Sequence, residues 1–238
     1  MKDQYFGDVN DFRKYGLLRS LVIPDRLRLG VCWMLTESDG KNDGSFLSYL
    51  WKPRIYRHSD PDLFDWMLQT IGLEKDCRTA RIEESGLLSS ASLFQSSILT
   101  DCKSERRQHF TDSTTQFGCC DIVFFDPDTG LETKSILRGC KDSRKYLYWD
   151  EVNNTFSAGS SVLIYQHFIR ENREEYTVRM AQRLREQTSA ATVFSFTTPH
   201  VLFLLASQPS HAVAFRRQLA AIRSIWNPKQ IRASEHAE

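Results

Sequence analysis

One short segment constrains the fold of this chain more than any other, residues 121–130, which read DIVFFDPDTG. Four apolar residues between Asp121 and Asp126 predict a strand that is buried on both faces, as in a parallel sheet. The strand ends at a carboxylate followed by proline. Because ligands of open α/β sheets bind beyond the carboxyl ends of the strands, we expect Asp126 and Asp128 at the functional edge of the sheet.

Strands and helices alternate along the rest of the chain. This alternation predicts an α/β fold with a mostly parallel sheet and one antiparallel edge. In chain order we expect a capped amphipathic helix that ends at Pro24, a strand over 28–35, a helix over 62–71, a strand over 160–167, a helix over 171–186, a hairpin of strands 191–196 and 200–206, and a helix over 219–226.

Residues 76–118 are the least regular part of the sequence. A strand is predicted near Thr79 to Ile82, followed by a serine-rich stretch and a basic segment that we expect to be helical. The tail after Pro228 is expected to fray. At 238 residues the chain fits a single domain over 1–238, with a possible inserted subdomain around residues 45–115.

Composition limits the kinds of partner that we expect for this protein and favours one cellular location. With 31 Lys and Arg against 30 Asp and Glu the net charge is +1, so a polyanion site would have to be a local patch. The sequence has neither an apolar run of about 18 residues nor a signal-peptide core, so we expect no membrane span. The 6 cysteines include no Cys-x-x-Cys pair and are expected to be free thiols, which favours a cytoplasmic protein.

Acidic residues and a histidine gather near the ends of predicted elements. Asp126, Asp128 and Glu132 follow one strand, and the pairs 150–151 and 166–167 are expected at the ends of neighbouring elements. Such a group could bind Mg²⁺ or Mn²⁺ through oxygen ligands, or one carboxylate could position a substrate amine. The plainer alternative is that Asp126 caps a turn and that the others lie on a solvated helix and at the edge of the core.

The amino-terminal segment carries a resemblance. Residues 7–15 read GDVNDFRKY, which resembles the start of the bacterial 23S ribosomal RNA adenine-N6 methyltransferases, whose first helix opens GNFADVLKH. Gly7, Asp11 and Lys14 coincide with that pattern. The family then has a strand with a cofactor loop, a variable insertion, a strand ending Asp-Pro-Pro-Tyr, another strand and a terminal hairpin, and this chain follows the same order.

The resemblance implies a Rossmann-like methyltransferase fold, with helices on both faces of the sheet, and methyl transfer from S-adenosylmethionine to an adenine amine. Asp126 and Pro127 match the first half of the Asp-Pro-Pro-Tyr motif, in which the carboxylate accepts hydrogen bonds from the amine. Asp128 and Thr129 depart from it, so the stacking ring is missing and a negative charge is added. Lys14 is implied near the cofactor or the base.

The loop over residues 36–44 is the implied cofactor site. It is polar and contains two glycines, which would let the backbone approach a nucleoside, while an acidic residue could meet ribose hydroxyls. The cofactor-binding candidates in this loop, in addition to Lys14, are Thr36, Asp39, Gly40 and Gly44.

Three hypotheses about function follow. The leading one is a methyltransferase-like protein that acts on an amine of a nucleic acid or nucleotide, with Asp126, Pro127, Asp128 and His167 as catalytic candidates. The second is a Mg²⁺- or Mn²⁺-dependent nuclease or hydrolase, in which Asp126, Asp128, Asp150 and His167 hold the metal and activate water. The third is a non-catalytic nucleic-acid-binding module that uses a basic patch of Arg106, Arg107, Arg138, Lys141, Arg144 and Lys145.

Overall fold

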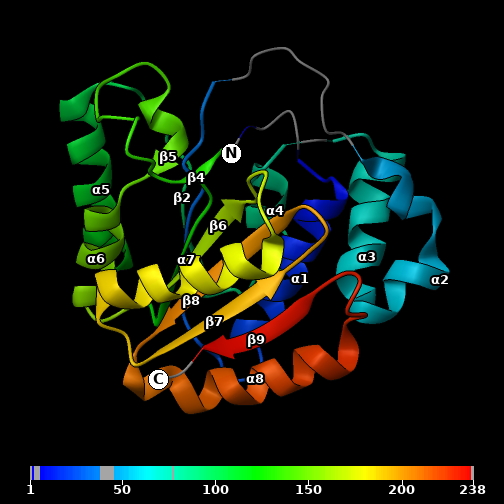
Figure 1. Cartoon of the computed structure of the whole chain (residues 1–238). Helices are drawn as coiled ribbons and strands as arrows, with labels where there is room; N and C mark the ends of the chain where they lie inside the picture. Colours follow the sequence, from blue (N-terminus) through cyan, green and yellow to red (C-terminus); the bar gives the residue numbers. More distant parts are fainter. Residues whose placement is uncertain (1, 3–5, 38–45, 77, 237–238) are drawn as a thin grey trace.

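A seven-stranded sheet forms the centre of the protein (Figure 1). The computed structural model describes residues 2, 6–37, 46–76 and 78–236. From one edge to the other the strands are β2 (Leu93–Gln95), β1 (Leu29–Cys32), β3 (Ile122–Phe125), β6 (Ser161–His167), β8 (Val201–Ser207), β7 (Thr192–Thr197) and β9 (Arg232–His236).

Strand directions confirm the predicted Rossmann-like α/β fold. Strands β2, β1, β3 and β6 pair in parallel, whereas β8 is antiparallel to both β6 and β7. The register aligns Cys32 with Phe125 and Phe125 with Ile164. The carboxyl ends of β1, β3 and β6 therefore meet at one edge of the sheet, where the sequence places Asp126.

Helices cover both faces of the sheet, as predicted (Figure 1). Each face has its own apolar cluster. One face is covered by α1 (Val9–Val22), α3 (Pro61–Met67) and α8 (Ala212–Ile225), and the other by α5 (Lys103–Phe117), α6 (Trp149–Ser157) and α7 (Arg173–Thr188).

Shorter elements connect these layers. They are η2 (Leu47–Trp51), α2 (Pro53–Tyr56), η3 (Arg57–Ser59), η4 (Leu68–Leu73), α4 (Ala80–Glu84), β4 (Gly130–Leu131), η5 (Ser143–Lys145), β5 (Tyr146–Leu147) and η6 (Pro209–His211). The inserted subdomain stays a prediction. None of the helices in the described segments has the length and apolar character that a membrane span requires.

Helix α1 is fixed at its amino end and in its middle. Asp8 caps the amino end, where its carboxylate accepts hydrogen bonds from the backbone N–H groups of Asn10 and Asp11. Further along, Gly16 lies against the indole ring of Trp226, and a Cβ at this position would come within 2.4 Å of the Trp226 Cζ2 atom. The helix that begins at the candidate site is thus packed directly on the carboxyl-terminal part of the chain.

Two predictions about secondary structure are wrong. The strand predicted near residues 79–82 is part of α4, because Arg81, Glu83 and Glu84 favour a helix and Ile82 alone is buried in it. The tail does not fray. Its residues 232–236 form β9, which pairs with β7, and the Ser195 hydroxyl is hydrogen-bonded to the His236 ring at 2.8 Å. The helix predicted in the basic segment is confirmed as α5.

Candidate functional site

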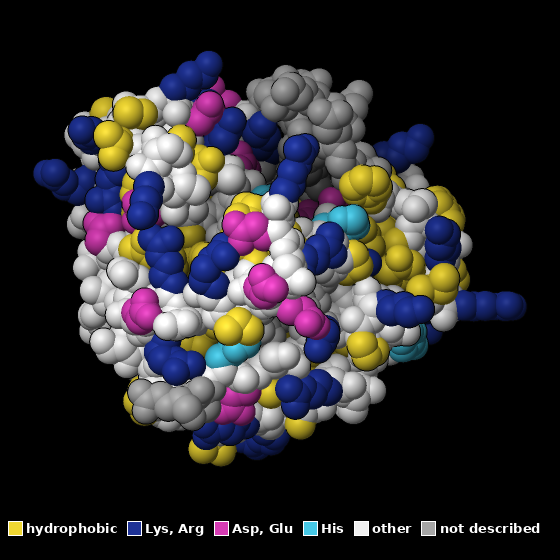
Figure 2. Space-filling view, viewed as in Figure 1, with side chains coloured by type: hydrophobic (Ala, Val, Ile, Leu, Met, Phe, Trp, Pro, Cys, Tyr) yellow, Lys and Arg dark blue, Asp and Glu magenta, His cyan; other side chains and the backbone are white. Residues whose placement is uncertain are grey.

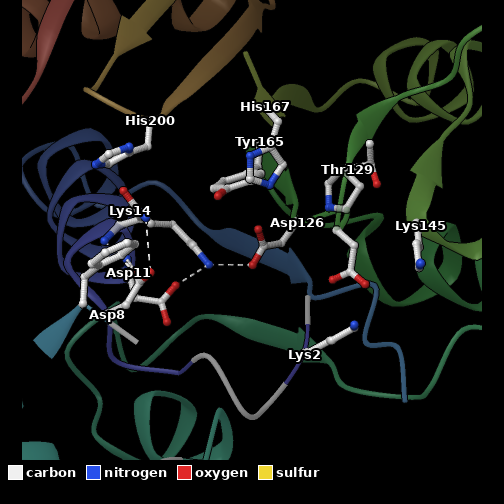
Figure 3. A pocket seen from close by; sticks show the side chains of 14 residues that line it. Lys2, Asp8, Asp11, Lys14, Asp126, Thr129, Lys145, Tyr165, His167 and His200 are labelled. Atoms are coloured by element: carbon white, nitrogen blue, oxygen red, sulfur yellow. Dashed lines mark hydrogen bonds and ion pairs between the residues drawn. The ribbon is translucent and has the colours of Figure 1, made fainter. Parts of the chain in front are cut away.

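A cavity of about 590 Å³ opens beyond the carboxyl ends of β3 and β6 (Figure 3). Five residues singled out from the sequence line it, namely Lys14, Asp126, Pro127, Asp128 and His167. Helix α1 and the turn before it contribute one wall, and the segment after β3 contributes the opposite one. Residues that are more than 100 positions apart in the chain are therefore joined at one site, as the parallel sheet predicts.

An ion cluster lies at the centre of this cavity. The Lys14 Nζ atom is 2.7 Å from the Asp126 Oδ2 atom and 2.7 Å from the Asp11 Oδ1 atom (Figure 3). Burial alone would lower the pKa of Lys14, but the charges of Asp11 and Asp126 outweigh it and raise that pKa. Burial raises the pKa of Asp126, and Lys14 opposes this rise. The ammonium of Lys14 thus stays charged and holds Asp126 in place.

The turn before α1 supplies two further carboxylates. The Asp11 Oδ2 atom accepts a hydrogen bond of 2.8 Å from the backbone N–H of Gly7, which aligns Asp11 with Lys14. Burial, followed by the nearby charge of Asp11, raises the pKa of Asp8 to about 7. Asp8 can therefore take up or release a proton near neutral pH while it lines the cavity.

Aromatic rings surround the ammonium of Lys14. Its Nζ atom is 5.5 Å from the ring centre of Tyr15, 5.8 Å from that of Trp33 and 5.5 Å from that of Tyr165. Of these rings, Tyr165 lines the cavity. The sequence reasoning missed Tyr165, although it lies within the predicted strand over 160–167, next to the strand that carries Asp126.

Asp128 is held by the segment that follows β1. The Thr36 hydroxyl donates a hydrogen bond to the Asp128 Oδ2 atom. Burial alone would raise the pKa of Asp128, but positive charge and the Thr36 hydrogen bond outweigh it and lower that pKa, with Lys2 contributing among the described residues. Thr36 is therefore at the predicted site, through its contact with Asp128. The other candidates of that loop, Asp39, Gly40 and Gly44, lie outside the described residues.

His167 ends β6 and faces the cavity. Burial lowers its pKa, so the imidazole is neutral at neutral pH. Its ring meets that of Tyr165 edge to face, with the centres 5.1 Å apart. The adjacent Gln166 accepts a hydrogen bond of 2.7 Å from the Leu131 backbone N–H and packs on Gly130, where φ is +123° and a Cβ would not fit. This contact fixes the turn that carries Asp128.

Three other acidic residues are not brought to the cavity. Glu132 accepts a hydrogen bond of 2.8 Å from the backbone N–H of Trp149, at the start of α6. Asp150 pairs with Arg138 and lines a separate cavity between α5 and α6, and Glu151 is buried against Arg106. The expectation that Asp150 shares a metal site with Asp126, Asp128 and His167 is therefore not met.

Within the described segments 2, 6–37, 46–76 and 78–236, no group of three or more His, Cys, Asp or Glu side chains is placed to hold a metal ion. At the cavity itself, Lys14 is the cation that two of the acidic side chains contact.

The predicted basic patch is largely neutralised by carboxylates. Arg106 is buried against Glu151, and three partly exposed cations pair with acidic residues of nearby loops and helices, while Arg107 and Lys141 are exposed. These pairs are Arg138 with Asp150, Arg144 with Asp101, and Lys145 with Asp142. On the face shown in Figure 2, Lys and Arg side chains are interspersed with Asp and Glu and form no large patch of one sign.

Comparisons with known proteins identify no family for this chain. No family model matches the chain, and no curated protein matches it. A crystal structure of a protein from Legionella pneumophila, described by the family model DUF519, is similar over 98% of this chain and 97% of that one, with 13% sequence identity and a TM-score of 0.47.

Proposed function

We propose that this protein is an S-adenosylmethionine-dependent methyltransferase-like enzyme that acts on an amine of a nucleic acid or nucleotide. The observation that carries the proposal is the position of Asp126 and Pro127. They follow β3 at the carboxyl edge of the sheet and line a cavity together with an aromatic ring, that of Tyr165. A carboxylate in this place can accept hydrogen bonds from an exocyclic amine, and a neighbouring ring can pack against a planar base.

The charge of the cavity lining suits such ligands. Its carboxylates are Asp8, Asp11, Asp126 and Asp128, against the ammonium groups of Lys2, Lys14 and Lys145. Because both lining histidines have lowered pKa values, through burial first, they add no positive charge at neutral pH. Over the described lining residues the net charge is therefore negative, by less than one unit because Asp8 with its pKa of about 7 is only partly ionised. This charge favours an amine or a cationic ligand, and the volume of the cavity is within the range of small-molecule sites.

S-adenosylmethionine fits this lining through its ammonium and sulfonium charges, and when bound it would supply the methyl group. Residues of the chain perform the other tasks. Asp126 would accept a hydrogen bond from the substrate amine, while Lys14 holds its Oδ2 atom at 2.7 Å and so fixes the carboxylate. The methylated nitrogen must lose a proton, and Asp8, with its pKa of about 7, lines the same cavity and can accept it.

Metal-dependent hydrolysis receives no comparable support. The Lys14 ammonium contacts Asp11 and Asp126, so it competes with Mg²⁺ or Mn²⁺ for these carboxylates.

We also propose a cytoplasmic location. Its support is that the five described cysteines, Cys32, Cys102, Cys119, Cys120 and Cys140, are free thiols.

Calorimetry tests the proposal directly. We expect the wild-type protein to bind both S-adenosylmethionine and its demethylated product, and the Asp126→Asn variant to lose methyl transfer to adenine-containing RNA while it still binds the cofactor. Asp150→Asn is the matched control, because the same chemical change is made outside the cavity. If neither S-adenosylmethionine nor its demethylated product gave a heat of binding at millimolar concentration, the proposal would be overturned.

A further inference from the structure

Arg13 is a buried cation that forms no ion pair with any of the described carboxylates, and the nearby charge of Asp8 does not outweigh the burial that lowers its pKa. Only 5% of its surface is exposed. Among the described residues no carboxylate lies within ion-pair distance of its guanidinium, and its Nε atom has no hydrogen-bond partner. The hydrogen bond of its side chain is a long one, 3.4 Å from the Nη1 atom to the Asn10 Oδ1 atom. Guanidinium cannot lose its proton in proteins, so this burial is costly unless an anion joins it.

Arg13 is not itself one of the cavity-lining residues, but its guanidinium contacts one of them. Its hydrogen-bond partner Asn10 lines the cavity, and so does His200 in the turn between β7 and β8. The pKa of His200 is lowered by burial first, and then by the positive charges of Arg13 and Arg173. Two cations from different elements thus act on this end of the cavity, opposite in sign to the carboxylates around Lys14.

An aromatic pair lies at the same end. The rings of Phe46 and His200 are parallel within 2°, with their centres 6.1 Å apart, and both line the cavity. Phe46 is 56% exposed, so the ring of this pair is accessible from the cavity. A positive charge next to exposed rings is the combination with which proteins bind single-stranded nucleotides, through phosphate contacts and base stacking.

We propose that Arg13 binds a phosphate group of the substrate, and that Phe46 and His200 form the stacking surface next to it. The nucleotide nature of the substrate rests on the proposed function. Arg13 and Lys14 are neighbours in α1, so one helix holds the amine-binding carboxylate through Lys14 and the phosphate through Arg13. Arginine suits this task because its planar group binds two phosphate oxygens at once.

The test compares ligands with and without phosphate. Calorimetry is performed with adenosine and with adenosine 5′-monophosphate, on the wild type, on Arg13→Met and on Arg13→Lys. We expect the phosphate to improve wild-type affinity roughly 10- to 100-fold, as a charge-assisted contact does. Arg13→Met loses this gain and keeps the affinity for adenosine, while Arg13→Lys recovers part of it. Arg107→Met is the matched control, an exposed arginine of α5 on the other face of the sheet, and it keeps the gain.

A second measurement guards against a folding defect. Because Arg13 carries an uncompensated buried charge, Arg13→Met should melt at the same or a higher temperature than the wild type when no ligand is present. Equal affinities of the wild type for the two ligands would overturn the inference. So would a loss of S-adenosylmethionine affinity in Arg13→Met with the phosphate gain intact, since the bound anion would then be the cofactor carboxylate. Both of these results leave the proposed function intact, provided that S-adenosylmethionine binds the wild type. If S-adenosylmethionine does not bind the wild type, the proposed function is refuted, whereas the phosphate effect of Arg13 is still measured separately.

Discussion

Two buried cations in this protein have similar surroundings and different roles. Lys14 is 2% exposed and Arg106 is 3% exposed, and each is paired with a carboxylate at 2.7 Å. Arg106 also donates to the backbone oxygens of Ser143 and Tyr146, so its guanidinium ties α5 to α6 and to the loop before it. Arg106 and Glu151 border the smaller cavity between α5 and α6, of about 290 Å³, whereas the partners of Lys14 line the larger one, of about 590 Å³, at the carboxyl edge of the sheet.

The difference shows that burial of an ion pair does not by itself identify a functional site. Around Arg106 the protein supplies the partners on several sides, including Tyr148, whose backbone N–H donates to Glu151 at 2.9 Å. Such a pair joins elements together. Around Lys14 the carboxylate of Asp126 is held on one side and borders open space on another, which is the arrangement that a ligand requires.

Breaking the Arg106 pair should have the largest effect on stability. We expect Glu151→Gln to lower the free energy of unfolding by about 3–5 kcal/mol, because it leaves a buried guanidinium without its counter-charge. Urea denaturation measures this loss. The double variant R106M/E151L should recover most of it, since it removes both charges together. A loss below about 1 kcal/mol in the single variant would mean that the Arg106 pair does not fix the fold.

Asp126→Asn should cost less stability and more function. We expect a loss of about 1–3 kcal/mol, because Asp11 still neutralises Lys14 after the substitution. The same denaturation experiment, combined with methyl-transfer assays, separates the two effects. If Asp126→Asn proved as destabilising as Glu151→Gln and left methyl transfer intact, the Lys14 cluster would have a structural role and not a functional one.

Titration of Asp8, which lines the cavity, should make the stability of the protein depend on pH. Its pKa in the folded protein is about 7, above the ordinary value of 3.8, so the folded state binds the proton more tightly than the unfolded state. This contribution to stability is present below about pH 4 and is lost as the pH rises to about 7. Asp8→Asn should remove this part of the pH dependence in denaturation curves measured from pH 4 to pH 8. An unchanged slope would show that Asp8 ionises normally.

The smallest effect is expected at Asp150. Its side chain is 58% exposed and its partner Arg138 is 36% exposed, so the solvent screens the pair. Asp150→Asn should change the free energy of unfolding by less than about 1 kcal/mol and should not affect ligand binding. Calorimetry and denaturation of this variant check both statements. A loss of activity here would instead favour the metal-dependent hydrolase.

The two segments that carry Asp126 and Lys14, on opposite walls of the site, could be predicted from the sequence better than the other parts. The apolar run before Asp126 and the capped helix that carries Lys14 are local signals, and the parallel sheet brings them together. Tyr165 was missed because a tyrosine within an apolar strand has the same pattern whether it faces the core or a cavity. Asp150 was misplaced because the position of a helix start depends on packing, which the order of elements does not determine.

The edge of the sheet was harder to predict for a related reason. Strand β9 has the sequence RASEH, in which polar side chains predominate, because an edge strand contacts its neighbour mainly through the backbone. Arg13 was also not singled out. A cation at the start of a helix normally predicts a solvated face, and only the fold shows that this one is buried.

The contact between Gly16 and Trp226 has a consequence for the synthesis of the protein. Translation produces α1 first, but its final packing surface on α8 exists only after residue 226 has left the ribosome. Pairing of β1 with β3 and of β3 with β6 requires no residue beyond β6. A nascent chain can therefore assemble the strands that carry Asp126 before it can pack the helix that carries Lys14, and the ion cluster forms only after residue 226 has been synthesised.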